Sequence, residues 1–437
     1  MDGYPGIVMG TLASLIREMA ECPALFVKTP EKDFARVRKL PFETVVRTLI
    51  SMGGNSICKE LLDANDYGLD TATASAFVQQ RDKILPCAFE FLLHKFNQSH
   101  PGAKLHRGYR LLAVDGSSLH IPTNPCDAET HFNCNPAGNG HNLLHLNAMY
   151  DLCNRVYADA ILQPGRLQSE TKAMVDMVGR SKLTGKAIVI ADRNYEGYNN
   201  LAHIEKKGWN YLIRIKDTGT RCILHGLRLP RKGSYDICTQ RILTRKKSQE
   251  VRARPDLYKI LDGGKVVFDF LDKTTPFYPM SFRVLRFKIA VGTYETVITN
   301  LDQSEFSPKD VKDLYKMRWG IETSFRELKY AIGLTSFHSK KRERIAQEVF
   351  ARIIMYNFAE TITSHVVISA AKSRHAYQVN FTVAIHICRH FLRLWINAPP
   401  FDVEALIRKN ILPVRPGRKD KRKTRFKTAV SFLYRVA

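Results

Sequence analysis

Two aspartates follow short apolar runs that are typical of buried strands. Asp115 comes after the run LLAV at 111–114, and Asp192 comes after the run AIVIA at 187–191. Such a strand delivers a carboxylate at its carboxyl end, the edge where α/β sheets bind their ligands. Either aspartate could instead cap a turn or a helix. Together, in a strongly basic chain, they indicate a site for Mg²⁺, which prefers oxygen ligands and acts on phosphates.

A third carboxylate, Glu322, lies in a segment that predicts a long amphipathic helix. At about 100° per residue, four polar side chains share an arc of about 60° on this helix: Tyr315, Arg318, Glu322 and Lys329. A separate stripe is apolar and consists of Ile321, Phe325, Leu328 and Ile332. A polar face usually turns toward solvent. With the apolar stripe beside it, we expect this face to lie along the rim of the sheet.

The composition points to a globular protein with a polyanionic partner. The chain has 437 residues, of which 44% are hydrophobic, and 67 Lys and Arg against 42 Asp and Glu give a net charge of +25. The apolar fraction excludes disorder, collagen and coiled coil. An excess of positive charge this large favours nucleic acid as the partner, and a merely basic surface is the alternative.

The sequence also predicts the compartment. No run approaches the roughly 18 apolar residues of a membrane span, and the start of the chain lacks the pattern of a signal peptide. The nine cysteines include no C-x-x-C pair, which fits reduced thiols in a cytosol. We therefore expect a soluble, cytoplasmic protein with no membrane partner.

Around the carboxylates, the chain predicts an α/β fold between two helical ends. Helical spacing covers 42–62 and 74–96, interrupted by Gly53, Gly54 and Pro86. Strand-like runs then occupy 110–116, 145–151, 155–162, 186–192 and 210–216, and helical stretches occupy 167–179 and 194–207. Strands first in series and then alternating with helices indicate a mixed sheet.

The second half of the chain predicts an insertion and then helices. Residues 217–290 are rich in Arg, Lys, Gly and Pro with several short strands, which predicts a β-rich insertion. After a strand at 294–301, Ser307 as N-cap, Pro308 and Asp310 predict a long helix that ends near Ala331. The remainder is helical and then basic, with ten Lys or Arg and one acid over 408–427.

The spacing Tyr315-x2-Arg318-x3-Glu322-x6-Lys329 resembles the Y-R-E-K signature of the type-four insertion-sequence transposases. These are bacterial cut-and-paste enzymes with a DDE catalytic triad. The segment VDGSSLHIP resembles the family's first-aspartate segment, and IADRNYEGY resembles its second. The resemblance covers about residues 40 to 395. It implies a ribonuclease H-like catalytic core, interrupted by a β-rich insertion before the helix that carries Glu322.

The resemblance also implies roles for these residues. Asp115, Asp192 and Glu322 would be the catalytic residues and would chelate two divalent metal ions, Mg²⁺ or Mn²⁺, for an in-line displacement at phosphorus. The DNA phosphates beside the cut would be held by Tyr315, Arg318 and Lys329. Trp319 would stack on a splayed base, unless it is a core tryptophan.

We therefore divide the chain into five parts. They are a helical DNA-end-binding region (1–105), a first part of the ribonuclease H-like core (106–216), the β-rich insertion (217–290), a second part of the core with the Glu322 helix (291–338), and a helical C-terminal region with a basic tail (339–437).

Three weaker signals leave alternatives open. Arg214 and Lys216 share a strand face near Asp192 and would grip DNA phosphate or form a salt bridge to a neighbouring helix. Cys126, Cys134, His141 and His145 resemble a zinc site only loosely, because the first gap is too long for a zinc knuckle. For a hairpin route of excision, Phe277 or Tyr278 of the insertion are candidates to clamp a flipped base.

Three functions are consistent with these residues. We expect a transposase that binds the terminal inverted repeats of an insertion sequence in double-stranded DNA, pairs them as a homodimer, cleaves, and joins the ends to target DNA. Such a bacterial protein would be nucleoid-associated when bound to DNA. The main alternative is a catalytically silent DNA-binding regulator or inhibitor of transposition. A structure-selective nuclease would cleave without joining, and the Y-R-E-K face argues against it.

Overall fold

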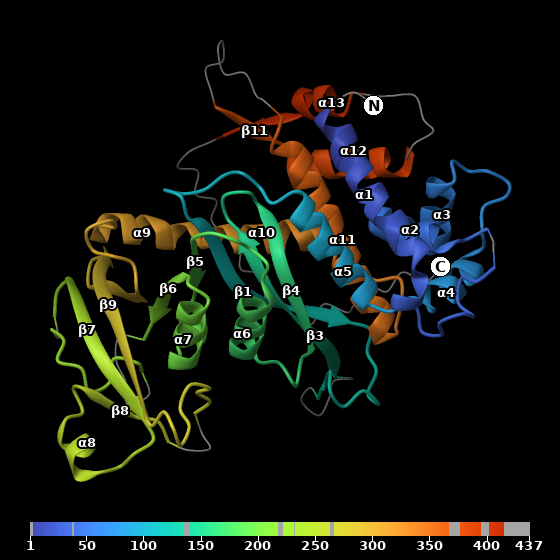
Figure 1. The fold of residues 1–437 in the computed structure, drawn as a ribbon. Helices are drawn as coiled ribbons and strands as arrows, with labels where there is room; N and C mark the ends of the chain where they lie inside the picture. The colour runs from blue at the N-terminus through green and yellow to red at the C-terminus, as the bar shows by residue number, and fades with distance from the viewer. Residues whose placement is uncertain are drawn as a thin grey trace.

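The computed structural model describes residues 3–36, 39–133, 140–216, 222–230, 232–262, 266–366, 376–394 and 402–414. They form a mixed α/β fold in which a large sheet joins a helical body at one end to the insertion at the other (Figure 1). Most of the predicted basic tail lies outside the described residues. Within them, no helix is long and apolar enough to span a membrane.

In the described part of the chain, ten strands form one sheet in the order β2-β3-β1-β5-β6-β10-β9-β7-β8, with β4 on β3. β3 is antiparallel to β1 and β4, whereas β5 and β6 run parallel to β1. The strands of this half are β1 (Arg110–Ile121), β2 (His131–Phe132), β3 (His141–Asp151), β4 (Val156–Pro164), β5 (Ala187–Ala191) and β6 (Asn210–Ile215). The mixed sheet that the sequence predicts is therefore confirmed.

The predicted strand end at Asp115 is wrong. β1 continues to Ile121 because its antiparallel partner β3 continues beside it, with Ile121 opposite Asn142. The parallel partner β5 stops earlier, and the last pair between the two strands joins Val114 to Ala191. Asp115 therefore lies one residue beyond the end of β5, in the middle of its own strand.

The strands of the predicted insertion extend the same sheet and project from it at the lower left of Figure 1. β10 pairs with both β6 and β9, and β7 pairs with β9 and β8. The elements of the predicted insertion are β7 (Tyr235–Thr244), α8 (Gln249–Ala253), β8 (Tyr258–Ile260) and β9 (Phe277–Ala290), and β10 (Thr293–Thr299) follows it.

Phe277 and Tyr278 lie far from Asp192 along the sheet. The turn between β9 and β10 lies at the same edge of the sheet as Asp192, because Thr296 pairs with Ile215 at the end of β6. The two aromatic residues begin β9 and lie at its opposite end. A strand of this length spans about 40 Å, so neither aromatic residue lies near the Asp192 of its own chain, and base clamping stays a prediction.

Helices cover both faces of the sheet. α6 (Glu170–Arg180) and α7 (Tyr198–Lys206) pack on Leu112 and Val114 of β1, and Leu111 and Ala113 face the helices on the other side. Those helices are α9 (Pro308–Met317), α10 (Trp319–Tyr330) and α11 (Arg342–Thr363). The alternating sides follow from the two-residue period of a strand.

The predicted long helix begins as expected but is divided in two. Ser307 and Asp310 form a capping box at the start of α9, and α10 ends at Tyr330. Between them, the Arg318 N–H donates to the Tyr315 carbonyl and the Ile321 N–H donates to the Arg318 carbonyl. These bonds span three residues instead of four, which tightens the turn and separates the two helices.

The two predicted helical ends of the chain share one hydrophobic core. Residues from Val8 to Phe96 and from Ile321 to Ile407 belong to a single buried cluster. The helices are α1 (Tyr4–Glu21), α2 (Phe42–Ser51), α3 (Ile57–Ala64), α4 (Ala74–Arg81), α5 (Cys87–Ser99), α11, α12 (Phe381–Leu394) and α13 (Val403–Lys409). A two-stranded sheet of β11 (Tyr377–Val379) and β12 (Ile411–Pro413) lies beside them.

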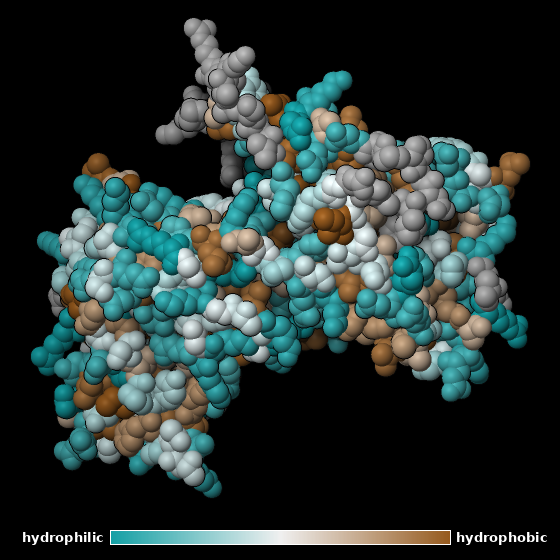
Figure 2. All heavy atoms as spheres, turned by 45° about the horizontal axis from the view of Figure 1, so that its top comes forward, coloured by the Kyte–Doolittle hydropathy of each residue, from teal (hydrophilic) through white to brown (hydrophobic). Residues whose placement is uncertain are grey.

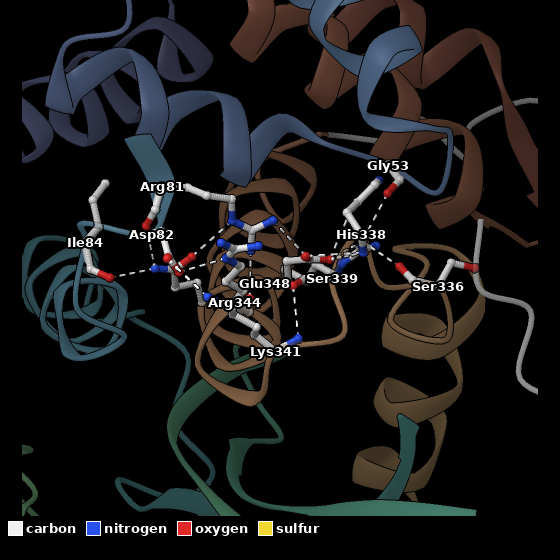
Figure 3. Close-up of polar contacts among 12 residues, drawn as sticks. Gly53, Arg81, Asp82, Ile84, Ser336, His338, Ser339, Lys341, Arg344 and Glu348 are labelled. Atoms are coloured by element: carbon white, nitrogen blue, oxygen red, sulfur yellow. Dashed lines mark hydrogen bonds and ion pairs between the residues drawn. The ribbon is translucent and has the colours of Figure 1, made fainter. Parts of the chain in front are cut away.

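A buried set of charges, which we name the α11 charge cluster, ties this helical body together (Figure 3). It consists of Arg81, His338, Glu348 and Arg352, each at most 6% exposed. The Glu348 carboxylate accepts from Arg81 at 3.0 Å and lies 3.0 Å from His338 Nδ1. Arg352 donates to the carbonyls of Gly53 and Ser336. The cluster therefore joins α4, the loop after α2 and the segment after α10 to α11.

On the face shown in Figure 2, hydrophilic side chains predominate and apolar ones form small separate groups.

Candidate active site

The strand register brings the two aspartates together. Val114 and Ala191 form the last pair of β1 and β5, so Asp115 and Asp192 are the next residues of two adjacent parallel strands. Asp192 also caps a 3-10 helix, with its Oδ1 accepting from the Asn194 N–H at 2.8 Å. Asp115 Oδ1 accepts from the Gly116 N–H at 2.8 Å. The capping alternative is thus realised for Asp192, at the same edge as Asp115.

α10 carries Glu322 to this edge, and Arg318 connects it to Asp115. Arg318 Nη2 lies 2.7 Å from Glu322 Oε1, and Nη1 lies 3.4 Å from Asp115 Oδ2. The Arg318 side chain is 8% exposed, against 20% for Asp115 and 40% for Glu322. A largely buried guanidinium therefore holds carboxylates from β1 and α10 on either side.

The surroundings of Asp115 disfavour the ionised form of its side chain. Burial raises the pKa of Asp115 to about 6, and the negative charges of Asp192 and Glu322 add to the rise. The Gly116 N–H and the Arg318 charge oppose it. Negative charges that raise the pKa of a nearby carboxyl group belong to the same electrostatic site as that group.

The other residues of the predicted polar face lie around this edge. Trp319 is 59% exposed, with the Arg318 guanidinium 5.1 Å from its ring centre, so it is not a core tryptophan. Lys329 Nζ donates to the Ser118 carbonyl at 3.0 Å, three residues beyond Asp115 on β1. Tyr315 is instead only 4% exposed, and its hydroxyl has no hydrogen-bond partner among the described residues. Burial raises the pKa of Tyr315 to about 12.

Arg214 and Lys216 differ in their surroundings. Arg214 Nε lies 3.1 Å from Glu295 Oε1, so the salt bridge left open by the sequence forms with the neighbouring strand β10, not with a helix. Lys216 is exposed, and its backbone N–H donates to Glu196 at 2.9 Å. Of the two, Lys216 keeps its side chain on the surface.

Carboxylate oxygens suit a hard divalent cation, and the crowding of negative charge at Asp115 is what such a cation would relieve. Among the described residues, however, no three His, Cys, Asp or Glu side chains converge closely enough to hold a metal ion as they stand. Of the loose zinc pattern, Cys134 lies outside the described residues, and Cys126 is exposed.

Sequence reasoning missed the layer behind Asp115. Gly116 faces His145 and Glu170, whose side chains lie 3.0 Å apart, and a Cβ at Gly116 would lie 2.3 Å from His145 Nε2. The Tyr195 hydroxyl is buried near Glu170, Asp115 and Asp192. Burial raises the pKa of Tyr195 most, and the negative charges of these three acids add to the rise. The glycine directly after a strand aspartate is the one signal in the sequence that could have indicated this close packing.

Comparison with known proteins identifies the family. A family model described as "Transposase DDE domain" matches residues 106–358. A putative transposase InsL of insertion sequence element IS186A from Escherichia coli is 33% identical over 58 residues, which is 13% of this chain and 16% of that protein. The transposase of insertion sequence element IS421 from Escherichia coli matches equally. The matched segment thus spans about a sixth of these curated relatives.

Among solved structures, the piggyBac transposase in a synaptic complex with hairpin DNA aligns over 95% of this chain and 87% of its own, with a TM-score of 0.46 and 10% identity. The family model covers more than half of the chain and spans Asp115, Asp192 and Glu322. The chain therefore belongs to the transposase family that carries a DDE domain.

Proposed function

We propose that this transposase binds the terminal inverted repeats of an insertion sequence and catalyses metal-dependent strand cleavage and strand transfer. One observation carries the proposal. The β1–β5 register makes Asp115 and Asp192 neighbours, and Arg318 links Asp115 to Glu322 on α10. Carboxylates from three distant parts of the chain thereby lie at one edge of the sheet, where the charges of Asp192 and Glu322 both act on Asp115.

The half of the sheet that carries this edge is, on this proposal, a ribonuclease H-like core. Its strands follow the order β4-β3-β1-β5-β6, three antiparallel and then two parallel to β1. The first parallel pair delivers both aspartates. The β-rich insertion then separates this half from the Glu322 helix.

Asp115, Asp192 and Glu322 would hold two divalent ions, Mg²⁺ or Mn²⁺. When bound, such ions activate the attacking oxygen and stabilise the leaving oxygen at phosphorus. The protein's own groups position the DNA. Arg318 would offer a planar fork to a phosphate once Glu322 and Asp115 release its guanidinium, and Lys329 would offer a point charge. The exposed Trp319 ring would offer a stacking surface for a base.

The remaining contacts follow from exposure and charge. Lys216 would contact the DNA backbone directly, and Arg214 would position Glu295 and the buried Tyr315 beside the site. We assign recognition of the DNA ends to the helical region 1–105 and pairing of the ends to a homodimer. The protein would act in the bacterial cytoplasm, on the nucleoid.

The test uses purified protein, a plasmid with the flanking terminal repeats, and Mg²⁺ or Mn²⁺. Wild type is compared with Glu322→Gln, which keeps the side-chain shape and removes a charge, and with Glu343→Gln, an exposed acid on α11. We expect Glu322→Gln to bind the ends but to lose at least about 100-fold in cleavage, as when one charge-stabilising group is removed from an active site. Glu343→Gln should cleave like wild type.

Other outcomes would replace the proposal. If wild type binds the ends tightly and never cuts with either metal, the protein is a regulator that occupies transposon ends. If it cuts but never joins, it is a nuclease on the same fold.

A further inference from the structure

The insertion contains a cavity of about 250 Å³ between α8, β8 and the turn at Gly226. Its lining consists of His225, Gly226, Val251, Arg252, Pro255, Tyr258, Lys259 and Ile260. The volume is below the roughly 300–1,000 Å³ of sites for drug-sized ligands. A cavity of this size suits a small group and not a large metabolite.

The cavity is lined by basic groups and by no acid. His225, Arg252 and Lys259 contribute nitrogen, and none of the lining residues carries a carboxylate. Two acids near the lining segment form ion pairs with cations outside the lining. Asp256 pairs with Arg228 at 3.3 Å, and Asp262 pairs with Lys247 at 3.2 Å. The local charge of the cavity is therefore positive.

A buried guanidinium lies directly behind the cavity wall. Arg241 is 0% exposed and donates to neutral oxygens, which are the Tyr198 hydroxyl and the carbonyls of Ile223, His225 and Pro255. Its Nε has no partner, and among the described residues no carboxylate pairs with it. A buried charge without an opposite charge is costly. An anion in the adjoining cavity would offset that cost.

The backbone at Gly226 allows this close approach. Gly226 has φ +90°, and a Cβ there would lie 2.8 Å from Arg241 Nη2 and 2.7 Å from the Pro255 carbonyl. Only glycine fits this position without strain. Lys259 is half-buried on the same wall, where burial and then the charge of Arg241 lower its pKa. The charge of Asp262 opposes this lowering, and it acts after that of Arg241.

We propose that this cavity binds a phosphate group, with Lys259 and Arg252 as its contacts and Arg241 as the buried charge behind it. The source we favour, resting on the proposed function, is a backbone phosphate of the bound DNA at the end of the insertion farthest from Asp192. Free phosphate carries the same chemistry, and the experiment distinguishes the two.

The first arm measures phosphate binding without DNA. Thermal unfolding of the full chain is followed in about 50 mM sodium phosphate and in sodium chloride of equal ionic strength. We expect phosphate to raise the melting temperature of wild type by about 1–2 °C, since it binds only the folded state. The rise should be lost in Lys259→Gln and in Arg252→Gln, and kept in Lys273→Gln, an exposed lysine of the insertion outside the lining.

The second arm measures binding of duplex DNA across a salt series, with no cleavage required. Loss of one phosphate contact should reduce the slope of log K against log salt by about 0.9 for Lys259→Gln, and Lys273→Gln should keep the wild-type slope. If Lys259→Gln loses the stabilisation by phosphate but keeps the wild-type salt slope for DNA binding, the cavity binds free phosphate and not DNA. No phosphate response in wild type and equal slopes for both variants would overturn the site. These readouts stand even if the protein never cuts DNA.

Discussion

At the scale of single residues, the packing behind Asp115 is as restrictive as the carboxylates themselves. A Cβ at Gly116 would lie 2.3 Å from His145 Nε2 and 2.5 Å from Glu170 Oε1. We therefore expect Gly116→Ala to destabilise the protein by about 1–3 kcal/mol through overpacking. It should also reduce strand cleavage, because the displaced strand carries Asp115. Urea unfolding and a cleavage assay measure the two effects.

Gly179 supplies the matched control. It lies exposed in α6, and a Cβ added there would meet no other atom within 4 Å. Gly179→Ala should stabilise the protein by about 0.5–1 kcal/mol, since alanine loses less conformational freedom in a helix. Equal effects of the two substitutions would contradict the close packing at Gly116.

At the scale of elements, α11 carries two buried acids in opposite electrostatic environments. Burial alone would raise the pKa of Glu348, but Arg81, His338 and Arg352 outweigh it and hold the pKa below its ordinary value. Its contribution to stability is therefore present above pH 4.5 and lost as the pH falls through the folded-state pKa. Glu348→Gln leaves buried guanidiniums uncompensated and should cost about 3–5 kcal/mol in the free energy of unfolding at pH 7.

Glu343→Gln on the same helix is the control, because its ion pair with Lys28 is largely exposed and contributes at most about 1 kcal/mol. Denaturant unfolding compares the two variants. A loss below about 1 kcal/mol for Glu348→Gln would show that the α11 charge cluster does not hold the helical body together.

Glu360 should show the reverse pH dependence. Burial raises its pKa to about 7, and Glu327 adds to the rise while Arg155 opposes it. The folded state then binds the proton more tightly than the unfolded chain between about pH 4.5 and 7, so wild-type stability from this group falls as the pH rises. The difference in the free energy of unfolding between Glu360→Gln and wild type should shift in favour of the variant by about 2–3 kcal/mol as the pH rises from about 5 to about 8. A difference that stays constant over this range would exclude Glu360 as the titrating group.

At the scale of the whole molecule, the catalytic sheet and the chain ends are not independent. Helices from 4–99 share one core with α10, α11 and α12. A fragment of residues 106–358, which spans the family match, exposes that core and should not unfold cooperatively. Dye binding to apolar surface and urea unfolding, compared with the full chain, measure this. Cooperative unfolding of the fragment would show that the sheet is self-sufficient.

Local signals in the sequence predict most elements but not their partners. The cap at Ser307, the apolar run before Asp192, and the breaks at Gly53 and Pro86 all act over a few residues, and the structure confirms the elements they delimit. The apolar run before Asp115 predicts a strand but not where that strand ends. The continuation of β1 through Gly-Ser-Ser is set by pairing with β3, which overrides a weak local preference. The shared core and the Arg81–Glu348 pair join residues hundreds of positions apart, so no local pattern indicates them.

Some properties of the site residues can also be predicted from local sequence, and others depend on contacts that only the fold creates. The chemistry and helical spacing of Glu322, Arg318 and Trp319 follow from the sequence, but the burial of Tyr315 and the Arg214–Glu295 pair depend on tertiary packing.

Strand pairing makes Asp115 and Asp192 neighbours. Their alignment therefore depends on the number of residues in each strand and not on how the side chains of the strands pack. One residue inserted into β5 would move Asp192 about 3.3 Å and exchange the faces of every side chain beyond it. The five buried residues of β5 can thus exchange for others of similar size, but their number cannot change. Over evolutionary time, this strand should vary in composition and remain constant in length.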